Sequence, residues 1–153
     1  VILDYAHTPA ALSNCLQNLH EQFINQKISI VFGCGGDRDK SKRSQMGKIA
    51  NKFCDKIYLT DDNPRFENPK KIRNQIKKKI TRSKLIEIAS REKAIKIAIE
   101  SLNSGDILVV AGKGHEIYQE YKGKKKFLHG KLNTEPSFYL IIKVYISTIL
   151  KLH

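Results

Sequence analysis

Apolar residues follow two alternating patterns along the chain. Short apolar runs, typical of buried strands, occupy residues 1–3, 27–32, 56–59, 85–89 and 107–111. Between these runs, apolar residues recur at every third or fourth position, which is the spacing of one helix face. The apolar positions of the four expected helices are Leu12, Cys15, Leu16, Leu19 and Phe23, then Met46, Ile49, Ala50 and Phe53, then Ile72, Ile76 and Ile80, and finally Ile95, Ala98, Ile99 and Leu102. Strands that alternate with helices predict an α/β fold, with a mostly parallel sheet and helices on both faces.

Local signals mark several element ends. Thr8 can cap the first helix, and Pro9 suits its first turn. Residues 117–121 and 125–128 are separated by Lys122 and Gly123, which predicts a C-terminal hairpin. No internal repeat or Pro/Gly/Ser-rich linker divides the chain, so a single domain is expected to fill most of it.

The composition of the 153 residues agrees with one globular domain, since 41% of them are hydrophobic. Three cysteines at wide spacings indicate neither a disulfide framework nor a cysteine-based zinc site, so a reduced, cytoplasmic location is expected. The most apolar run, at residues 138–150, contains Lys143 and is shorter than the ~20 residues of a membrane helix. The chain opens on Val1 inside an apparent strand, and we expect it to be a piece of a longer protein.

The formal net charge is +13, and eight basic residues without an acidic one fall between positions 70 and 84. One interpretation is a nucleic-acid-binding patch. The other, which we favour, is a solvated helix face, because aromatic residues do not interleave with this run as a single-strand-binding surface requires.

Four unusual polar clusters each directly follow a predicted strand. They occupy residues 4–7, 33–43, 61–67 and 112–116. Because ligands of an open α/β sheet bind at the carboxyl ends of the strands, we expect all four clusters to meet along one edge.

The residue types in these clusters suit a ligand that carries both charges. The candidates for holding carboxylate or phosphate are Arg38, Arg43 and Arg65. The candidates for holding ammonium groups are Asp61, Asp62, Glu67 and Glu116. Asn63 offers a donor and an acceptor, and the glycines at 33, 35, 36, 112 and 114 allow close backbone approach. The mixture fits a zwitterion such as an amino acid, although each cluster taken singly could be an ordinary turn.

Four stretches carry a resemblance to a known family: LDYAHTPAAL, VFGCGGDRDKSKRSQMGKIA, TDDNPRFENP and VVAGKGHEIYQ. In this order and spacing they resemble the C-terminal domain of the Mur ligases, most closely of the members that add diaminopimelate. The resemblance covers residues 1–121. It implies a Rossmann-like domain that follows a UDP-sugar-binding domain and a central ATPase domain.

The resemblance also implies a reaction in peptidoglycan synthesis. ATP, with Mg²⁺, activates the glutamate carboxylate of UDP-N-acetylmuramoyl-L-alanyl-D-glutamate, and the amine of meso-diaminopimelate attacks it. ATP and Mg²⁺ are expected to be bound mainly by the central domain. Nucleic acid and a membrane span are not expected.

The family's functional positions carry over to nine residues of this chain. The expected diaminopimelate contacts are Arg38, Asp62, Asn63, Pro64, Arg65, Gly112 and Glu116. Asp4 and His7 match positions that face the nucleotide. No catalytic residue and no metal ligand is assigned to this chain. Lysine-adding relatives lack the arginine that matches Arg65, which therefore favours diaminopimelate.

The last part of the sequence departs from the family pattern. Residues 1–129 are expected to form the amino-acid-binding domain, whereas residues 130–153 form an atypical tail. We expect deletion of residues 133–153 to improve solubility. Without the other two domains the chain is expected to be inactive. Two other functions stay open at this point: a stand-alone nucleotide- or anion-binding module, and a nucleic-acid-binding domain.

Overall fold

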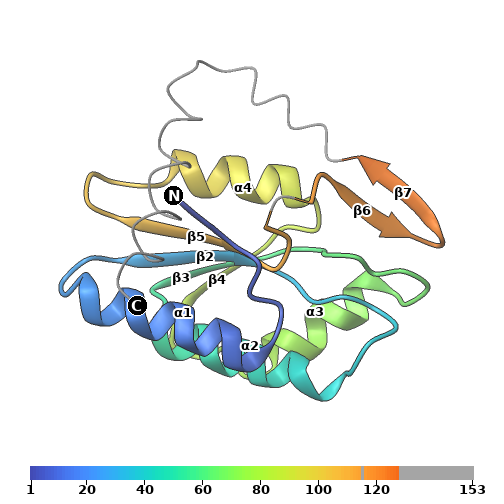
Figure 1. Ribbon diagram of the computed structural model, residues 1–153, viewed down its shortest axis with the longest axis horizontal. Helices are drawn as coiled ribbons and strands as arrows, with labels where there is room; N and C mark the ends of the chain where they lie inside the picture. The colour runs from blue at the N-terminus through green and yellow to red at the C-terminus, as the bar shows by residue number, and fades with distance from the viewer. Residues whose placement is uncertain (115, 128–153) are drawn as a thin grey trace, which may run out of the picture.

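The computed structural model describes residues 1–114 and 116–127, and the expected tail at residues 130–153 lies outside them. Five parallel strands form one sheet in the order β1-β5-β2-β3-β4 (Figure 1). Their bounds are β1 Ile2–Asp4, β2 Ile28–Phe32, β3 Lys56–Leu59, β4 Lys84–Glu87 and β5 Ile107–Ala111. Each lies within two residues of a strand predicted from an apolar run, so the prediction of a parallel sheet is confirmed.

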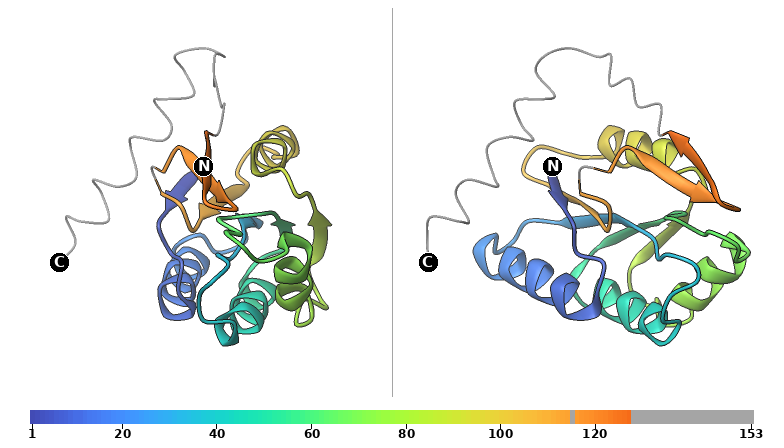
Figure 2. Two further views of the ribbon diagram at one scale, coloured as in Figure 1. Left: turned by 90° about the vertical axis from the view of Figure 1, so that its right-hand side faces the viewer. Right: turned by 45° about the vertical axis from the view of Figure 1, so that its right-hand side comes forward.

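Four helices cover the sheet on both faces, as predicted. Three of them, α1 (Pro9–Gln22), α2 (Ser41–Phe53) and α3 (Pro69–Lys77), lie on one face. The fourth, α4 (Arg91–Glu100), lies on the other (Figures 1 and 2). The third helix is shorter than its apolar spacing suggests, because it ends at Lys77, and Ile80 packs against the core from the following turn.

The two faces have separate cores. Between the sheet and α1 to α3, fully buried side chains include Leu12, Leu16, Met46 and Ile76. Beneath α4, the core is smaller and includes Ala94, Ala98 and the residues of β2 and β5 that face this helix, Val31, Leu108 and Val110. Alternate residues of the central strands therefore point into different cores, which explains why β5 is apolar throughout and β2 is apolar except at Ser29.

The cap predicted for the first helix is present, and a second helix begins with a similar cap. The Thr8 hydroxyl accepts a hydrogen bond from Ala11 N–H at 3.3 Å, and Pro9 occupies the first turn of α1. Asn68 caps α3 in the same way, by accepting from the N–H groups of Lys70 and Lys71. These caps determine where the chain leaves each loop at the sheet edge.

The predicted C-terminal hairpin is confirmed as β6 (Tyr118–Tyr121) and β7 (Lys124–Phe127). Lys122 and Gly123 have φ values of 49° and 73°. Two successive residues with positive φ form the tight turn that matches strand twist. The hairpin does not join the main sheet but meets the loop after β3, where Arg65 forms an isolated bridge with Tyr121.

Part of the basic run at residues 70–84 serves the interior of the domain. Arg73 on α3 is 9% exposed and forms ion pairs with Asp61 and Glu87. Lys77 pairs with Glu87 at 2.8 Å. Among residues 1–114 and 116–127, no helix combines the length and apolar character needed to cross a bilayer.

Candidate functional site

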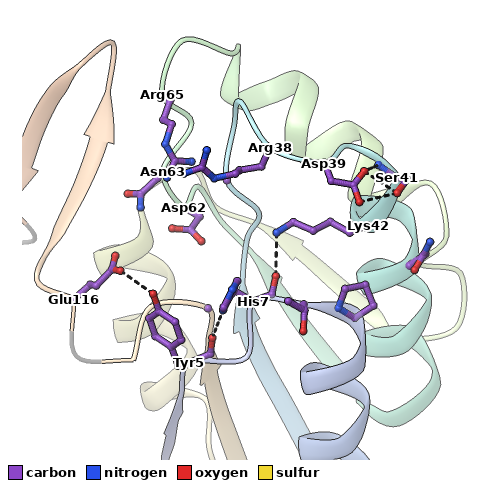
Figure 3. A pocket seen from close by; sticks show the side chains of 15 residues that line it. Tyr5, His7, Arg38, Asp39, Ser41, Lys42, Asp62, Asn63, Arg65 and Glu116 are labelled. Carbon is purple, nitrogen blue, oxygen red and sulfur yellow. Dashed lines mark hydrogen bonds between the residues drawn. The ribbon is translucent and has the colours of Figure 1, made fainter.

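A cavity of about 650 Å³ lies at the carboxyl ends of the strands, and all four polar clusters contribute to it (Figure 3). Its lining residues are Tyr5, His7, Thr8, Pro9, Gly35, Arg38, Asp39, Ser41, Lys42, Gln45, Asp62, Asn63, Arg65, Gly112 and Glu116. Seven of the nine residues expected from the family pattern line this cavity, and the other two, Asp4 and Pro64, do not. The parallel strand directions bring these distant segments to one edge.

The anionic side of the cavity is formed by Asp62 and Glu116, with Asn63 beside them. All three are tied to Lys113, a residue that the sequence did not single out. Its ammonium nitrogen lies 2.9 Å from Asn63 Oδ1, 3.0 Å from Glu116 Oε2 and 3.3 Å from Asp62 Oδ1. Lys113 is 2% exposed, so it supports this side from beneath.

Glu116 is held in its ionised form by these neighbours. Burial, the largest single effect, favours the neutral acid, but the hydrogen bond and charge of Lys113 outweigh it and lower the pKa of Glu116. The Tyr5 hydroxyl donates to Glu116 Oε1 at 3.3 Å and helps in the same direction. Proximity to Glu116 raises the pKa of Tyr5 in turn. A carboxylate kept ionised at a cavity wall is suited to accept an ammonium group.

The cationic side of the cavity is formed by Arg38 and Arg65, whose side chains point toward one another in Figure 3. Both flank Gly35: a Cβ there would lie 3.0 Å from Arg65 Nη1 and 3.9 Å from the Arg38 side chain. Two guanidinium groups at one place can share an anion such as a carboxylate. With the acidic side opposite, the cavity offers complementary charge to both the carboxylate and the ammonium group of an amino acid.

Arg65 is held in an unusual backbone conformation by the hairpin. Its φ is +50°, in the left-handed region, which costs a non-glycine residue about 1–2 kcal/mol. Its N–H donates to Glu120 O at 3.0 Å, and its carbonyl accepts from Lys122 N–H at 2.8 Å. Its side chain donates to Gly36 O at 2.7 Å and pairs with Glu120 at 3.3 Å. The sequence does not reveal this role of the hairpin, because strand β6 looks like any short exposed strand.

Arg43 and Glu67 do not act as ligand-holding groups, contrary to the expectation from their residue types. Arg43 is fully buried and donates to both oxygens of Glu67, at 2.9 and 2.8 Å. It also donates to Gln75 and to Gly35 O. The Arg43 hydrogen bonds lower the pKa of Glu67 to about 2. This pair therefore fastens the first turn of α2 to the loop after β3.

Asp61 is likewise used inside the domain rather than at the cavity. It is 7% exposed, pairs with Arg73 and accepts from the Tyr121 hydroxyl at 3.2 Å. Burial, with the nearby Asp61 charge, raises the pKa of Tyr121 to about 12. The expectation that Asp61 holds a ligand ammonium is therefore wrong.

The glycines after β2 serve contact between loops more than approach to a ligand. A Cβ on Gly33 would lie 2.3 Å from Thr60 O, and one on Gly36 would lie 2.0 Å from Pro64 O. Gly36 N–H donates to Asn63 O at 2.8 Å. The absence of side chains lets the two loops touch, and this contact sets the separation of Arg38 and Arg65.

Three expected site residues take different positions from the rest. Asp4 does not line the cavity, and its carboxylate accepts from Ala6 N–H at 2.6 Å. Pro64 is buried beneath the loop and is also absent from the lining. His7 is exposed at the cavity rim, with its Nδ1 3.0 Å from Tyr5 O. In residues 1–114 and 116–127, His, Cys, Asp and Glu side chains form no group of three that could hold a metal.

Comparisons with known proteins give a consistent result. Residues 1–114 match the family model described as Mur ligase, glutamate ligase domain. The UDP-N-acetylmuramoyl-L-alanyl-D-glutamate--2,6-diaminopimelate ligase of Rickettsia typhi is 53% identical over 128 residues, which are 82% of this chain and 26% of that protein. The chain thus spans about a quarter of the length of the curated relatives it matches.

Solved structures agree with this likeness. A structure of a UDP-N-acetylmuramoyl-L-alanyl-D-glutamate--2,6-diaminopimelate ligase is 45% identical, with a TM-score of 0.75, over 82% of this chain and 26% of that one. A domain from a putative UDP-N-acetylmuramate:L-alanyl-gamma-D-glutamyl-medo-diaminopimelate ligase of Haemophilus ducreyi shares the fold, with 12% identity and a TM-score of 0.53. That likeness covers 74% of this chain and 79% of that one.

Proposed function

Because the chain belongs to the Mur ligase family, we propose that it is the C-terminal, amino-acid-binding domain of an ATP-dependent ligase of peptidoglycan synthesis. The proposed reaction adds meso-diaminopimelate to UDP-N-acetylmuramoyl-L-alanyl-D-glutamate. Names of relatives about 50% identical to this chain support the choice of substrate. The observation that carries the proposal is a single cavity with two arginines on one side and two carboxylates on the other.

The charges of the cavity fit the end of diaminopimelate that does not react. This end carries one ammonium and one carboxylate on the same carbon. We assign the carboxylate to Arg65 and Asn63, and the ammonium to Asp62 and Glu116. Gly112, with φ of +100°, allows the chain to pass beside Asp62, since a Cβ there would lie 3.5 Å from Asp62 Oδ2. Arg38 is assigned to the other carboxylate, which diaminopimelate shares with lysine.

Lysine provides the most informative comparison. It has an ammonium group at its far end but no second carboxylate. Arg65 would then remain in a partly buried site without its anionic ligand, which is unfavourable. Discrimination between the two amino acids is therefore assigned mainly to Arg65.

We assign the part of the cavity near His7, Ser41 and Lys42 to the reacting groups, which are the attacking amine of the amino acid and the activated glutamate carboxylate. ATP supplies the phosphoryl group that activates the glutamate carboxylate, while residues of this domain bind and orient the attacking amino acid. Asp4 and His7 would contribute the outer wall of the nucleotide site. Mg²⁺, like most of the ATP site, is assigned to the central domain that the family resemblance implies. Such a ligase works in the cytoplasm, where ATP and nucleotide-linked precursors are present.

Calorimetry on the 153-residue chain tests the binding role directly. We expect binding of meso-diaminopimelate, much weaker binding of lysine, and no binding of a DNA oligonucleotide. A chimera that carries this chain in place of the matching domain of the Rickettsia typhi ligase tests the reaction, through phosphate release that depends on meso-diaminopimelate. Tight DNA binding without diaminopimelate binding would overturn the proposal in favour of a nucleic-acid-binding domain.

A further inference from the structure

Lys113 is an ammonium group buried at the base of the cavity, between Gly112 and Gly114 in the loop after β5. A buried ammonium is costly unless each of its three N–H groups finds an acceptor. Here the acceptors are Asn63 Oδ1 at 2.9 Å, Glu116 Oε2 at 3.0 Å and Tyr118 O at 2.7 Å. Asp62 Oδ1 lies 3.3 Å away and completes the surroundings. Such complete pairing shows that the loops close around this nitrogen.

The partners of Lys113 belong to different parts of the site. Asp62 and Asn63 follow β3, Glu116 follows β5, and Tyr118 begins the hairpin that holds the Arg65 backbone. Lys113 itself does not line the cavity, whereas Asp62, Asn63 and Glu116 do. It can therefore affect a ligand through these residues, without touching it.

The charge of Lys113 offsets the repulsion between two neighbouring carboxylates. Asp62 and Glu116 both lie within 3.3 Å of one nitrogen, so their carboxylates are close neighbours. Two such carboxylates without a cation between them repel, and this repulsion, added to burial, favours the protonated form of Glu116. A protonated carboxyl is a poor partner for an ammonium group. A cation between them keeps both available as acceptors.

The amide of Asn63 is oriented by the same contact. Its Oδ1 accepts from Lys113 and also from Glu120 N–H, which lies 2.9 Å away. With two donors directed at the oxygen, the NH₂ group must face the other way. In this orientation the amide donors are free of Lys113, and a hydrogen bond from Asn63 helps to lower the pKa of Glu116.

We infer that Lys113 is a positioning residue for the amino-acid substrate: it holds the Asp62 and Glu116 carboxylates side by side as acceptors for the distal ammonium and fixes the Asn63 amide beside them. The inference rests on the proposed function. It explains why the sequence places a lysine between two glycines, since Gly112 and Gly114 both have positive φ, 100° and 50°, and the loop turns Lys113 inward.

Loss of Lys113 would change how binding depends on pH. The pKa of Glu116 lies below its ordinary value of 4.5 largely through Lys113, so removing the cation lets burial raise that pKa. The other groups that face Glu116 and Lys113 remain in the variant. They are Tyr5 in the loop after β1, Asp62, the buried Arg91 of α4, and Tyr118, whose ring also lies near Lys125. Wild-type affinity should vary little between pH 8 and 5.5, whereas the variant should lose affinity as the pH falls and Glu116 takes up a proton.

The test compares Lys113→Met, which keeps the chain length without the charge, with Lys113→Arg, which keeps the charge in a different shape. Lys79→Met, at an exposed position, serves as the control for loss of one charge. Binding of meso-diaminopimelate to the 153-residue chain is measured by calorimetry at pH 5.5, 7 and 8, and urea unfolding checks each variant. We expect Lys113→Met to bind about tenfold or more weakly at pH 7, with a further loss of about threefold from pH 8 to 5.5.

Lys113→Arg should fold, bind about threefold or more weakly, and keep the flat pH profile of the wild type. If the wild-type chain does not bind meso-diaminopimelate, the proposed function fails rather than this inference. If it binds and Lys113→Met matches it in affinity and pH profile, the positioning role is wrong. Should Lys113→Met fail to fold, Lys113→Arg decides, and wild-type affinity in that variant would overturn the inference.

Discussion

Replacement of Arg65 by alanine separates diaminopimelate from lysine more sharply than any other change in the cavity. In the proposed complex, the guanidinium of Arg65 holds the carboxylate that lysine lacks. Arg65 is already fixed by Gly36 O at 2.7 Å and by Glu120 at 3.3 Å, so it is in place before a ligand arrives. Arg65→Ala therefore removes a preorganised cation and little else from the binding surface.

The size of the effect follows from how exposed the contact is. Removing one partner of a buried, hydrogen-bonded charge pair typically costs ~2–5 kcal/mol. The side chain of Arg65 is 20% exposed, so solvent partly screens its contact with the ligand carboxylate. The side chain of Glu120 is 31% exposed, so water can solvate it once Arg65 is removed. We therefore expect the low end of the range, about 2 kcal/mol, which is roughly a 30-fold weaker affinity for meso-diaminopimelate.

Calorimetric titration of the chain with both amino acids measures this difference. Lysine, which never made the contact, should change by less than about threefold. Arg38→Ala should weaken both amino acids if Arg38 holds the carboxylate that they share. Arg82→Ala is the matched control, because it removes the same charge from an exposed position lining a different hollow of the surface. It should leave both affinities unchanged.

Equal losses for lysine and diaminopimelate in Arg65→Ala would refute the reasoning. That result would mean that Arg65 does not read the distal carboxylate and that its role is to support the loop. Urea unfolding of the variant distinguishes this case, since a loop support would also lower the free energy of unfolding. The choice of diaminopimelate would then depend on the relatives' names without support from the cavity.

Three further predictions concern the loops and the nucleotide. Gly36→Ala would place a Cβ about 2.0 Å from Pro64 O, so the two loops must separate; we expect urea unfolding to show a loss of at least ~1 kcal/mol, and a stability equal to wild type would contradict the close approach. Arg43 lowers the pKa of Glu67 from 4.5 to about 2, so this pair's stabilisation is complete above pH 4.5 and is lost as the pH falls through 2. Arg43→Met should accordingly flatten the fall in unfolding free energy over that range, and an unchanged slope would assign the acid sensitivity elsewhere. ATP should bind this chain more weakly than ~1 mM, because a few contacts give only about −4 kcal/mol; micromolar binding by calorimetry would show that the nucleotide-facing residues are wrongly assigned.

The pattern of apolar residues was enough to predict the elements of this fold and the edge where its chemistry gathers. Continuous apolar runs are the signature of strands buried on both sides, and helical spacing marks the helices that cover them. Parallel strands place their carboxyl ends together, so the four polar clusters had to meet once the sheet was predicted. Arg38, Asp62 and Glu116 lie at one cavity for that reason.

The division of charged residues between the cavity and the interior was decided by the tertiary structure. Arg38, in the loop after β2, and Arg43, in the first turn of α2, are five positions apart, yet one lines the cavity and the other is fully buried against Glu67. Lys113 shows the same effect, because its partners Asn63 and Tyr118 come from two other segments. A charge is buried when the fold supplies acceptors for it, and acceptors 24 or 50 positions away leave no local pattern in the sequence.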